Sequence, residues 1–159
     1  MPVDAEAIPR LKDFKYRVEI NGLEAAMVQE FEPGTRTHGV TVHSGAGMNH
    51  VAKEVGMVGF SNAVLRSVVP LSGTGRIYWE NWLDQAQDPT TGNGGIPAQY
   101  QRNFSVFELA PDGTPCRVFE YIKAFPVSYK VNAKSSLDDS NDVLEFVEIC
   151  YNRRDVRVL

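Results

Sequence analysis

Two segments late in the chain place apolar side chains on both faces of a β-strand, and few small folds accommodate such strands. In residues 117–125 the two sets are Val118, Ile122 and Ala124 on one face and Phe119, Tyr121 and Phe125 on the other. In residues 143–151 they are Val143, Val147 and Ile149 on one face and Leu144 and Phe146 on the other. A lone antiparallel sandwich keeps one face of each strand in water, so these strands require a second cover. A neighbouring subunit in a closed ring would supply that cover, and irregular pairing caused by β-bulges is the alternative explanation.

The rest of the chain also predicts β-structure. Residues 15–20 alternate between polar and apolar side chains, which is the period of a half-buried strand. Further strands are expected at 26–32, 37–43, 62–69, 102–109, 116–125, 127–131 and 143–151. Asn21-Gly22 and Pro33-Gly34 are turn signals, so we expect the first three strands to form an antiparallel meander. Two antiparallel sheets forming a sandwich or barrel, with one flanking helix, are the predicted fold class.

Residues 44–57 show no clear period and contain several glycines. We interpret them as an extended loop, and loops of this length in a compact domain are usually functional or disordered. The whole chain of 159 residues fits a single domain with one core, preceded by an N-terminal arm over residues 1–13.

One helix is predicted, from Thr74 to Gln87. Its apolar stripe comes from Tyr78, Trp79, Trp82 and Leu83, which recur at spacings of three and four residues. Asp88-Pro89 ends it, because a residue before proline is disfavoured in the helical conformation. Two tryptophans on one stripe indicate that the helix packs over a large apolar surface.

No arrangement of residues predicts catalysis, a cofactor or a metal. His38 and His43 lie five residues apart on an expected strand and so point to opposite faces, and no cysteine or carboxylate cluster joins them and His50. Gly45-Ala46-Gly47 lacks the rest of a phosphate-binding pattern. Asp138-Asp139 stands in a polar loop without an aromatic cleft that would raise a carboxyl pKa. We therefore expect a protein that is not an enzyme.

Charge and hydropathy set further limits. The net charge of −4 argues against a nucleic-acid-binding surface, and no apolar run approaches the roughly 20 residues of a membrane-spanning helix. The N-terminus has neither the basic region nor the apolar run of a signal peptide, so the chain is expected to fold in the cytoplasm or to leave by a route other than ordinary secretion. Cys116 and Cys150 are distant in sequence and are expected to be free thiols on strands.

The order of these elements resembles a known family. The first strand is followed by Asn21-Gly22-Leu23 and then by two further strands. The glycine-rich stretch comes next, as His43-Ser44-Gly45-Ala46-Gly47. After it come Gly59-Phe60-Ser61-Asn62-Ala63-Val64-Leu65-Arg66 and the aromatic helix Ile77-Tyr78-Trp79-Glu80-Asn81-Trp82. From about Phe14 to Tyr151, the chain is similar to the tail tube proteins of contractile phages and to the inner-tube proteins of phage-tail-like injection systems. The ring protein of type VI secretion shares that fold.

The resemblance implies a structural subunit. Six copies would form a ring whose inner sheets join into one closed barrel, and stacked rings would make a conduit for DNA or protein cargo. The partners implied are the surrounding sheath protein, the baseplate and the proteins that start and end the tube. The loop expected to contact a neighbouring subunit or ring contains Ser44, Gly45, Ala46, Gly47, Met48, Asn49 and His50. The location implied is a virion tail or a phage-tail-like particle that is assembled in the bacterial cytoplasm.

Two other functions stay open at this point. The chain would be a tube-initiator paralogue of the same particle if it did not polymerise by itself. It would be a small β-sandwich binding module if Trp79 and Trp82 were exposed platforms for stacking on a ligand.

Overall fold

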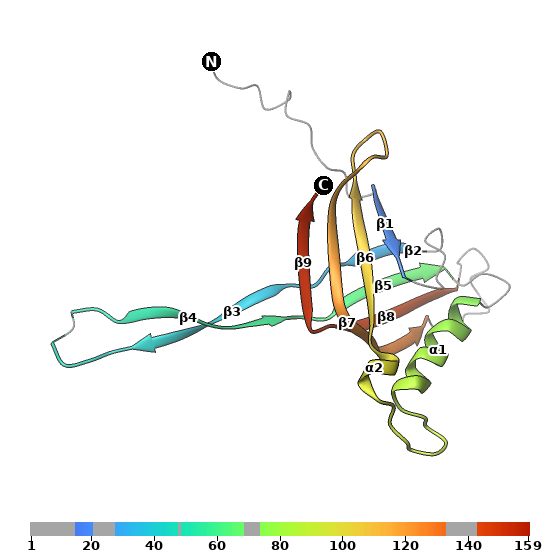
Figure 1. Ribbon diagram of the computed structural model, residues 1–159, viewed down its shortest axis with the longest axis horizontal. Helices are drawn as coiled ribbons and strands as arrows, with labels where there is room; N and C mark the ends of the chain where they lie inside the picture. The colour runs from blue at the N-terminus through green and yellow to red at the C-terminus, as the bar shows by residue number, and fades with distance from the viewer. Residues whose placement is uncertain (1–14, 21–27, 48, 69–73, 133–142) are drawn as a thin grey trace.

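The computed structural model describes residues 15–20, 28–47, 49–68, 74–132 and 143–159. Along these residues the elements are β1 (Tyr16–Glu19), β2 (Val28–Glu32), β3 (Arg36–His43), β4 (Ala52–Phe60), β5 (Ala63–Val68), α1 (Thr74–Ala86), α2 (Pro97–Tyr100), β6 (Arg102–Leu109), β7 (Pro115–Val131), β8 (Leu144–Cys150) and β9 (Arg153–Val158). The fold is mainly β with one long helix, as predicted (Figure 1).

Six strands form a continuous hydrogen-bonded path, β1–β6–β7–β8–β5–β2, and β9 joins it by pairing with β7; the resulting sheets pack against each other as a sandwich. Sheet A contains β1, β6, the first half of β7, and β9, while sheet B contains the second half of β7, β8, β5 and β2. β7 can belong to both sheets because it is 17 residues long and its pairing shifts near its middle. All the pairings in both sheets are antiparallel.

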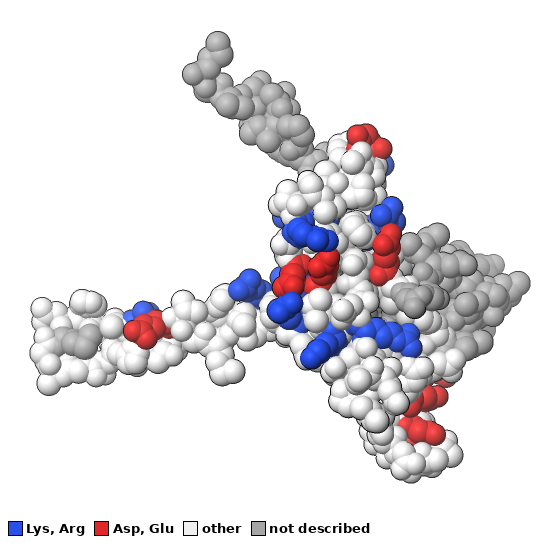
Figure 2. All heavy atoms as spheres, in the orientation of Figure 1, with Lys and Arg blue, Asp and Glu red and all other residues white. Residues whose placement is uncertain are grey.

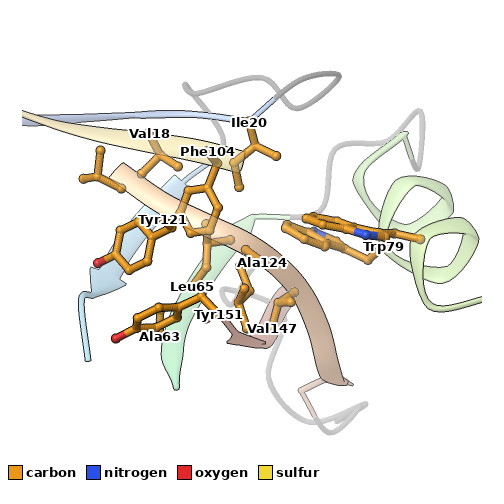
Figure 3. Close-up of a cluster of buried hydrophobic side chains, with 13 residues drawn as sticks. Val18, Ile20, Ala63, Leu65, Trp79, Phe104, Tyr121, Ala124, Val147 and Tyr151 are labelled. Atoms are coloured by element: carbon orange, nitrogen blue, oxygen red, sulfur yellow. The ribbon is translucent and has the colours of Figure 1, made fainter. Parts of the chain in front are cut away.

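The core lies between the two sheets and is rich in aromatic rings. Phe104 and Tyr121 of sheet A stack with centroids 4.5 Å apart, and Phe31 of sheet B meets both rings edge-on. Leu65 and Val147 are fully buried beside them (Figure 3). Burial of such side chains is the main favourable term in folding, at about 1.5–3 kcal/mol for each large apolar residue.

Helix α1 completes this core through its tryptophans. Trp79 and Trp82 are fully buried and stack with centroids 5.8 Å apart, and Figure 3 shows Trp79 directed from the helix toward Ala124 and Val147. The Trp82 indole Nε1 donates a hydrogen bond to the Tyr100 carbonyl at 2.6 Å. The helix predicted from the aromatic stripe thus ends within one residue of its expected boundary.

The predicted meander of the first three strands is wrong. β1 pairs with β6, β2 pairs with β5, and β3 pairs with β4, so each early strand finds a partner later in the chain. The expected loop over 44–57 is also shorter, because residues from Ala52 onward form β4. A register shift opposite Gly39 breaks the alternation in β4, which hides this strand in the sequence.

A β-bulge explains part of the doubly apolar pattern of β7. Lys123 has a positive φ of 54°, and the pairing with β6 shifts beside it, so Tyr121 and Ala124 both reach the core although they are three residues apart. The β-bulge therefore accounts for part of the pattern. Residues 116–131, expected as two strands, are one strand.

The second doubly apolar segment, β8, keeps a half-buried apolar outer face. Val147 and Ile149 face the core, whereas Leu144 and Phe146 lie on the opposite face of sheet B. The cross-strand neighbours of Phe146 are Arg66 and Lys130, whose hydrocarbon stems can cover an aromatic ring while their charges stay in water.

Candidate assembly interface

The most unusual part of the molecule is a hairpin that leaves the body. β3 and β4 form their own two-stranded sheet, which extends sideways from the sandwich as a continuation of β2 and β5 (Figure 1). All eight residues of β3 are exposed. A two-stranded hairpin without a supporting layer is at best marginally stable in water, so this segment is expected to need a partner.

The two faces of the hairpin differ in chemistry. The pairing register places four valines on one face, namely Val40, Val42, Val55 and Val58, and the same face carries His38 and Lys53 as the partners of Val58 and Val42. Val40 and Val55 are cross-strand partners and are 63% and 75% exposed. The opposite face carries Thr41 and the pair His43–Glu54, whose side chains approach to 3.3 Å. We call these the valine face and the polar face of the hairpin.

The valine face continues the apolar core of the body. Phe60, at the base of β4, lies on this face and contacts the Tyr151 ring with centroids 5.6 Å apart. Exposed apolar side chains arranged as a contiguous patch usually mark an interaction site. In this hairpin they extend outward from the core without any cover among the described residues.

A cluster of hydrogen bonds fixes the hairpin at its root. The Pro33 carbonyl accepts from the Tyr121 hydroxyl at 2.9 Å and from Arg154 Nη1 at 2.8 Å, and Arg154 also donates to the Gly34 carbonyl at 2.8 Å. The Tyr151 hydroxyl lies 3.5 Å from the same Pro33 oxygen. Strands β7 and β9 therefore hold the corner from which the hairpin projects.

The ionisation state of this cluster suits its role. Burial raises the pKa of the Tyr121 hydroxyl well above its ordinary value, although the nearby Arg154 guanidinium opposes that rise. The hydroxyl consequently remains protonated at neutral pH and can donate to the carbonyl.

Gly34 is required at this root by its conformation and its surroundings. Its φ is +78°, and a Cβ at this position would lie 2.6 Å from the Ser61 carbonyl oxygen and 2.7 Å from the Tyr151 hydroxyl. We expect Gly34→Ala to reduce the free energy of unfolding by about 2 kcal/mol or more, since both the left-handed backbone and the steric clash disfavour alanine. Gly47→Ala is the matched control, because Gly47 has a φ of +87° but open space around it. Urea unfolding that shows equal losses in both variants would contradict the steric explanation.

The residues expected to form an inter-subunit loop lie at the tip of this hairpin. Ser44–Gly47, Asn49 and His50 are exposed in the connection between β3 and β4, and Met48 lies outside the described residues. The sequence identifies the tip and the strand β3 before it, but not the valine face, because the irregular pattern of β4 hides the partner of β3. The N-terminal arm predicted over residues 1–13 also lies outside the described part.

Of the four helix residues expected to pack, two lie in the core and two are half-buried beside it. Trp79 and Trp82 are fully buried, and Tyr78 and Leu83 are half-buried. Arg102 from β6 lies over the Trp82 ring at 4.6 Å and donates to the Tyr78 hydroxyl at 3.2 Å. Because neither tryptophan is accessible, the interpretation of the chain as a binding module with exposed tryptophan platforms is wrong.

Other kinds of site find no support in the described residues. Within them, no group of three or more histidine, cysteine, aspartate or glutamate side chains is placed to hold a metal ion. His38 and His43 lie on opposite faces of the hairpin. Cys116 and Cys150 are free and half-buried.

As for membranes, no helix in the described ranges is long and apolar enough to cross one.

Comparison with solved structures identifies the class of fold. A chain of the tube-terminating cap of the anti-feeding prophage superposes with a TM-score of 0.78 at 13% identity, covering 99% of this chain and 97% of that one. A chain of the extended sheath–tube complex of PVC, an extracellular contractile injection system, gives 0.74 at 13% identity, covering 99% of this chain and 100% of that chain. Hcp1 from Flavobacterium johnsoniae gives 0.52 at 12% identity, covering 90% and 94%. No curated protein sequence is significantly similar to the chain.

The fold is thus the one found in contractile injection systems and in Hcp. The chain belongs to the family of the T4-like virus tail tube protein gp19, whose model matches residues 12–154. This confirms the family resemblance drawn from the sequence.

Proposed function

We propose that this chain is the structural subunit of the inner tube of a contractile tail or injection system, in which six copies form a ring and stacked rings form a conduit. The observation that carries the proposal is the projecting hairpin, whose valine face has no cover among the described residues. A side chain such as Val40 exposes to water an apolar surface that a second copy would bury, at about 25 cal/mol per Å². Membership of the tail tube family supports this proposal, because a tube is built from many copies whose surfaces cover one another.

The same proposal includes the surroundings of the tube. The sheath, the baseplate and the proteins that start and end the tube would be its partners, and DNA or protein would be its cargo. These partners are proposed because the similar structures come from a sheath–tube complex, a terminating cap and a baseplate. The proposed role is purely structural, without catalysis. We also propose that the chain assembles in the bacterial cytoplasm, as part of a phage or a phage-tail-like particle.

Negative-stain electron microscopy of the purified chain, together with its mass in solution, tests this function. We expect rings with a central hole, or stacked tubes, at protein concentrations where contacts between copies are occupied. Rings that do not stack would favour a tube-initiator paralogue over the main tube subunit. A monomer without rings at high concentration would contradict the proposed function.

A further inference from the structure

The connection between α1 and α2 contains an asparagine followed by two glycines. Asn93, Gly94 and Gly95 lie in a loop that leaves the end of α1 and turns back to α2 (Figure 1). An asparagine side chain is an internal electrophile, because the amide nitrogen of the next residue reaches its Cγ by closing a five-membered ring. A glycine in the next position leaves this attack unhindered, since it has no Cβ. We propose that Asn93 is a site of spontaneous deamidation in the folded chain, which converts it to aspartate and isoaspartate.

The hydrogen bonds of the loop leave the attacking nitrogen available. Gly94 forms an isolated antiparallel bridge with the residue that follows α1. The hydrogen bonds of this bridge belong to the flanking residues: the Asn93 carbonyl accepts from the Asp88 amide at 3.0 Å, and the Gly95 amide donates to the Ala86 carbonyl at 2.9 Å. Gly94 therefore occupies the position of an antiparallel pair that exchanges no hydrogen bonds with its partner. Its amide donates to no acceptor among the described residues, so no hydrogen bond has to break before the attack.

The group that is attacked is also accessible. The Asn93 side chain is exposed, and its carboxamide makes no hydrogen bond within the described part of the chain. The backbone of the same residue is held, because its amide donates to the Thr91 hydroxyl at 3.3 Å and its carbonyl accepts from Asp88. The loop thus keeps the two reacting groups adjacent while water reaches the carboxamide.

The reaction needs water as its only co-reactant. The Gly94 nitrogen loses its proton and bonds to Cγ of Asn93, the bond from Cγ to Nδ2 breaks, and ammonia leaves with that proton. The product is a succinimide ring that contains the Asn93 carbonyl carbon and the Gly94 nitrogen. One water molecule then opens the ring. Addition at Cγ gives aspartate, and addition at the main-chain carbonyl gives isoaspartate, in which the chain continues through the former side chain. No oxidant or reductant takes part, and each product carries a new carboxylate.

Both products change this end of the body. The new negative charge lies close to Asp88, and Figure 2 shows acidic side chains already present at this end, where Asp84 and Asp88 lie. In isoaspartate, the carbonyl that accepts from the Asp88 amide becomes a carboxylate, and the path to Gly94 is longer by one methylene. The bridge to the end of α1 then loses its spacing. We expect proteolysis within residues 87–96 to become several-fold faster, because the loop is no longer tied to the helix.

Mass analysis of one tryptic peptide tests the proposed modification. Trypsin releases residues 77–102 as a single peptide, whose two asparagines are Asn81 and Asn93. After incubation of the folded chain in warm, mildly alkaline buffer, we expect this peptide to gain the mass difference between asparagine and aspartate. Fragmentation should locate the change at Asn93. Enzymatic methylation by an isoaspartyl methyltransferase, which recognises the carboxylate of isoaspartate, should label the same peptide.

Two substitutions separate the proposed chemistry from general ageing. Gly94→Ala should slow the reaction at least about tenfold, because a Cβ obstructs the attack of the nitrogen. This variant is expected to fold, since a Cβ at Gly94 would meet the Ala86 carbonyl oxygen at 3.9 Å, an ordinary contact. Asn93→Gln should abolish the change of mass, because its ring would need six members. Gly47→Ala is the matched control, since it changes an exposed glycine far from this loop and should leave the rate unaltered.

Comparison of the folded chain with the chain unfolded in urea tests the structural part of the inference. We expect the two rates to differ by less than about tenfold, because folding restrains neither the Gly94 amide nor the Asn93 carboxamide through a hydrogen bond. A folded chain that reacts more than about a hundredfold more slowly would overturn the inference. Equal rates at Asn81 and Asn93, or an unchanged rate in Gly94→Ala, would do the same. The reaction requires no assembly, so these results are independent of whether the chain forms rings.

Discussion

Replacement of Trp82 by alanine is expected to reduce the free energy of unfolding by about 3–5 kcal/mol, the usual cost of removing a large aromatic side chain from a core. The indole is fully buried, stacks on Trp79, and donates to the Tyr100 carbonyl at 2.6 Å. Its loss would leave a cavity and an unpaired carbonyl, and it would remove the ring over which Arg102 lies. Denaturation in urea, followed by circular dichroism, measures the change.

The control for this variant is Glu80→Ala on the exposed side of the same helix. It should change stability by no more than about 0.5 kcal/mol, because surface substitutions away from specific contacts have small effects. A loss of less than about 1 kcal/mol for Trp82→Ala would show that the helix does not depend on this ring for its attachment to the sandwich.

Two aspartates on the valine face of the hairpin are expected to abolish assembly without unfolding the subunit. Val40 and Val55 are direct cross-strand partners and are mostly exposed, so Val40→Asp with Val55→Asp removes little buried surface from a single copy. In an assembled tube the same two carboxylates would be buried against a neighbouring copy, which is strongly unfavourable for unpaired charges. We expect loss of rings and tubes by electron microscopy, with the urea midpoint of the monomer nearly unchanged.

The polar face supplies the matched control for the hairpin. Thr41→Asp lies on the same strand as Val40 and faces the other way, so it should reduce assembly far less. Equal loss of assembly in both variants would mean that the valine face has no special role. Normal tubes from the double valine variant would remove the main support for the proposed function.

The sequence by itself determined those elements whose side chains alternate between a core and water. The period of two locates β1, β5 and β6 closely, and the spacing of three and four residues locates α1. Both periods arise because one side of the element is buried against the core. The order of these elements along the chain is also sufficient to indicate the tail tube family.

Two strands outside the core, β4 and β9, are not predicted in this way, although the exposed strand β3 is expected at residues 37–43. Both faces of β4 are largely exposed, and its bulge interrupts the alternation, so its sequence has the irregular pattern of a loop. β9 escapes prediction because Arg154 shares a face with Val156 and Val158, so this edge strand lacks a clean alternation of polar and apolar residues. A strand that packs against little in its own chain carries little of the pattern that packing imposes.

Pairing between distant segments was decided by the tertiary structure alone. The charge of Glu145 predicts a place at the surface, yet this side chain is buried. Its carboxylate oxygens accept hydrogen bonds from the Ser67 hydroxyl at 3.4 Å and from the Tyr129 hydroxyl at 3.0 Å. Ser67 is 78 residues away in the sequence, and the hairpin root joins Pro33 to Arg154 across 121 residues. Local sequence patterns record whether a residue faces a core, whereas the choice of partner depends on contacts that exist only once both sheets have formed.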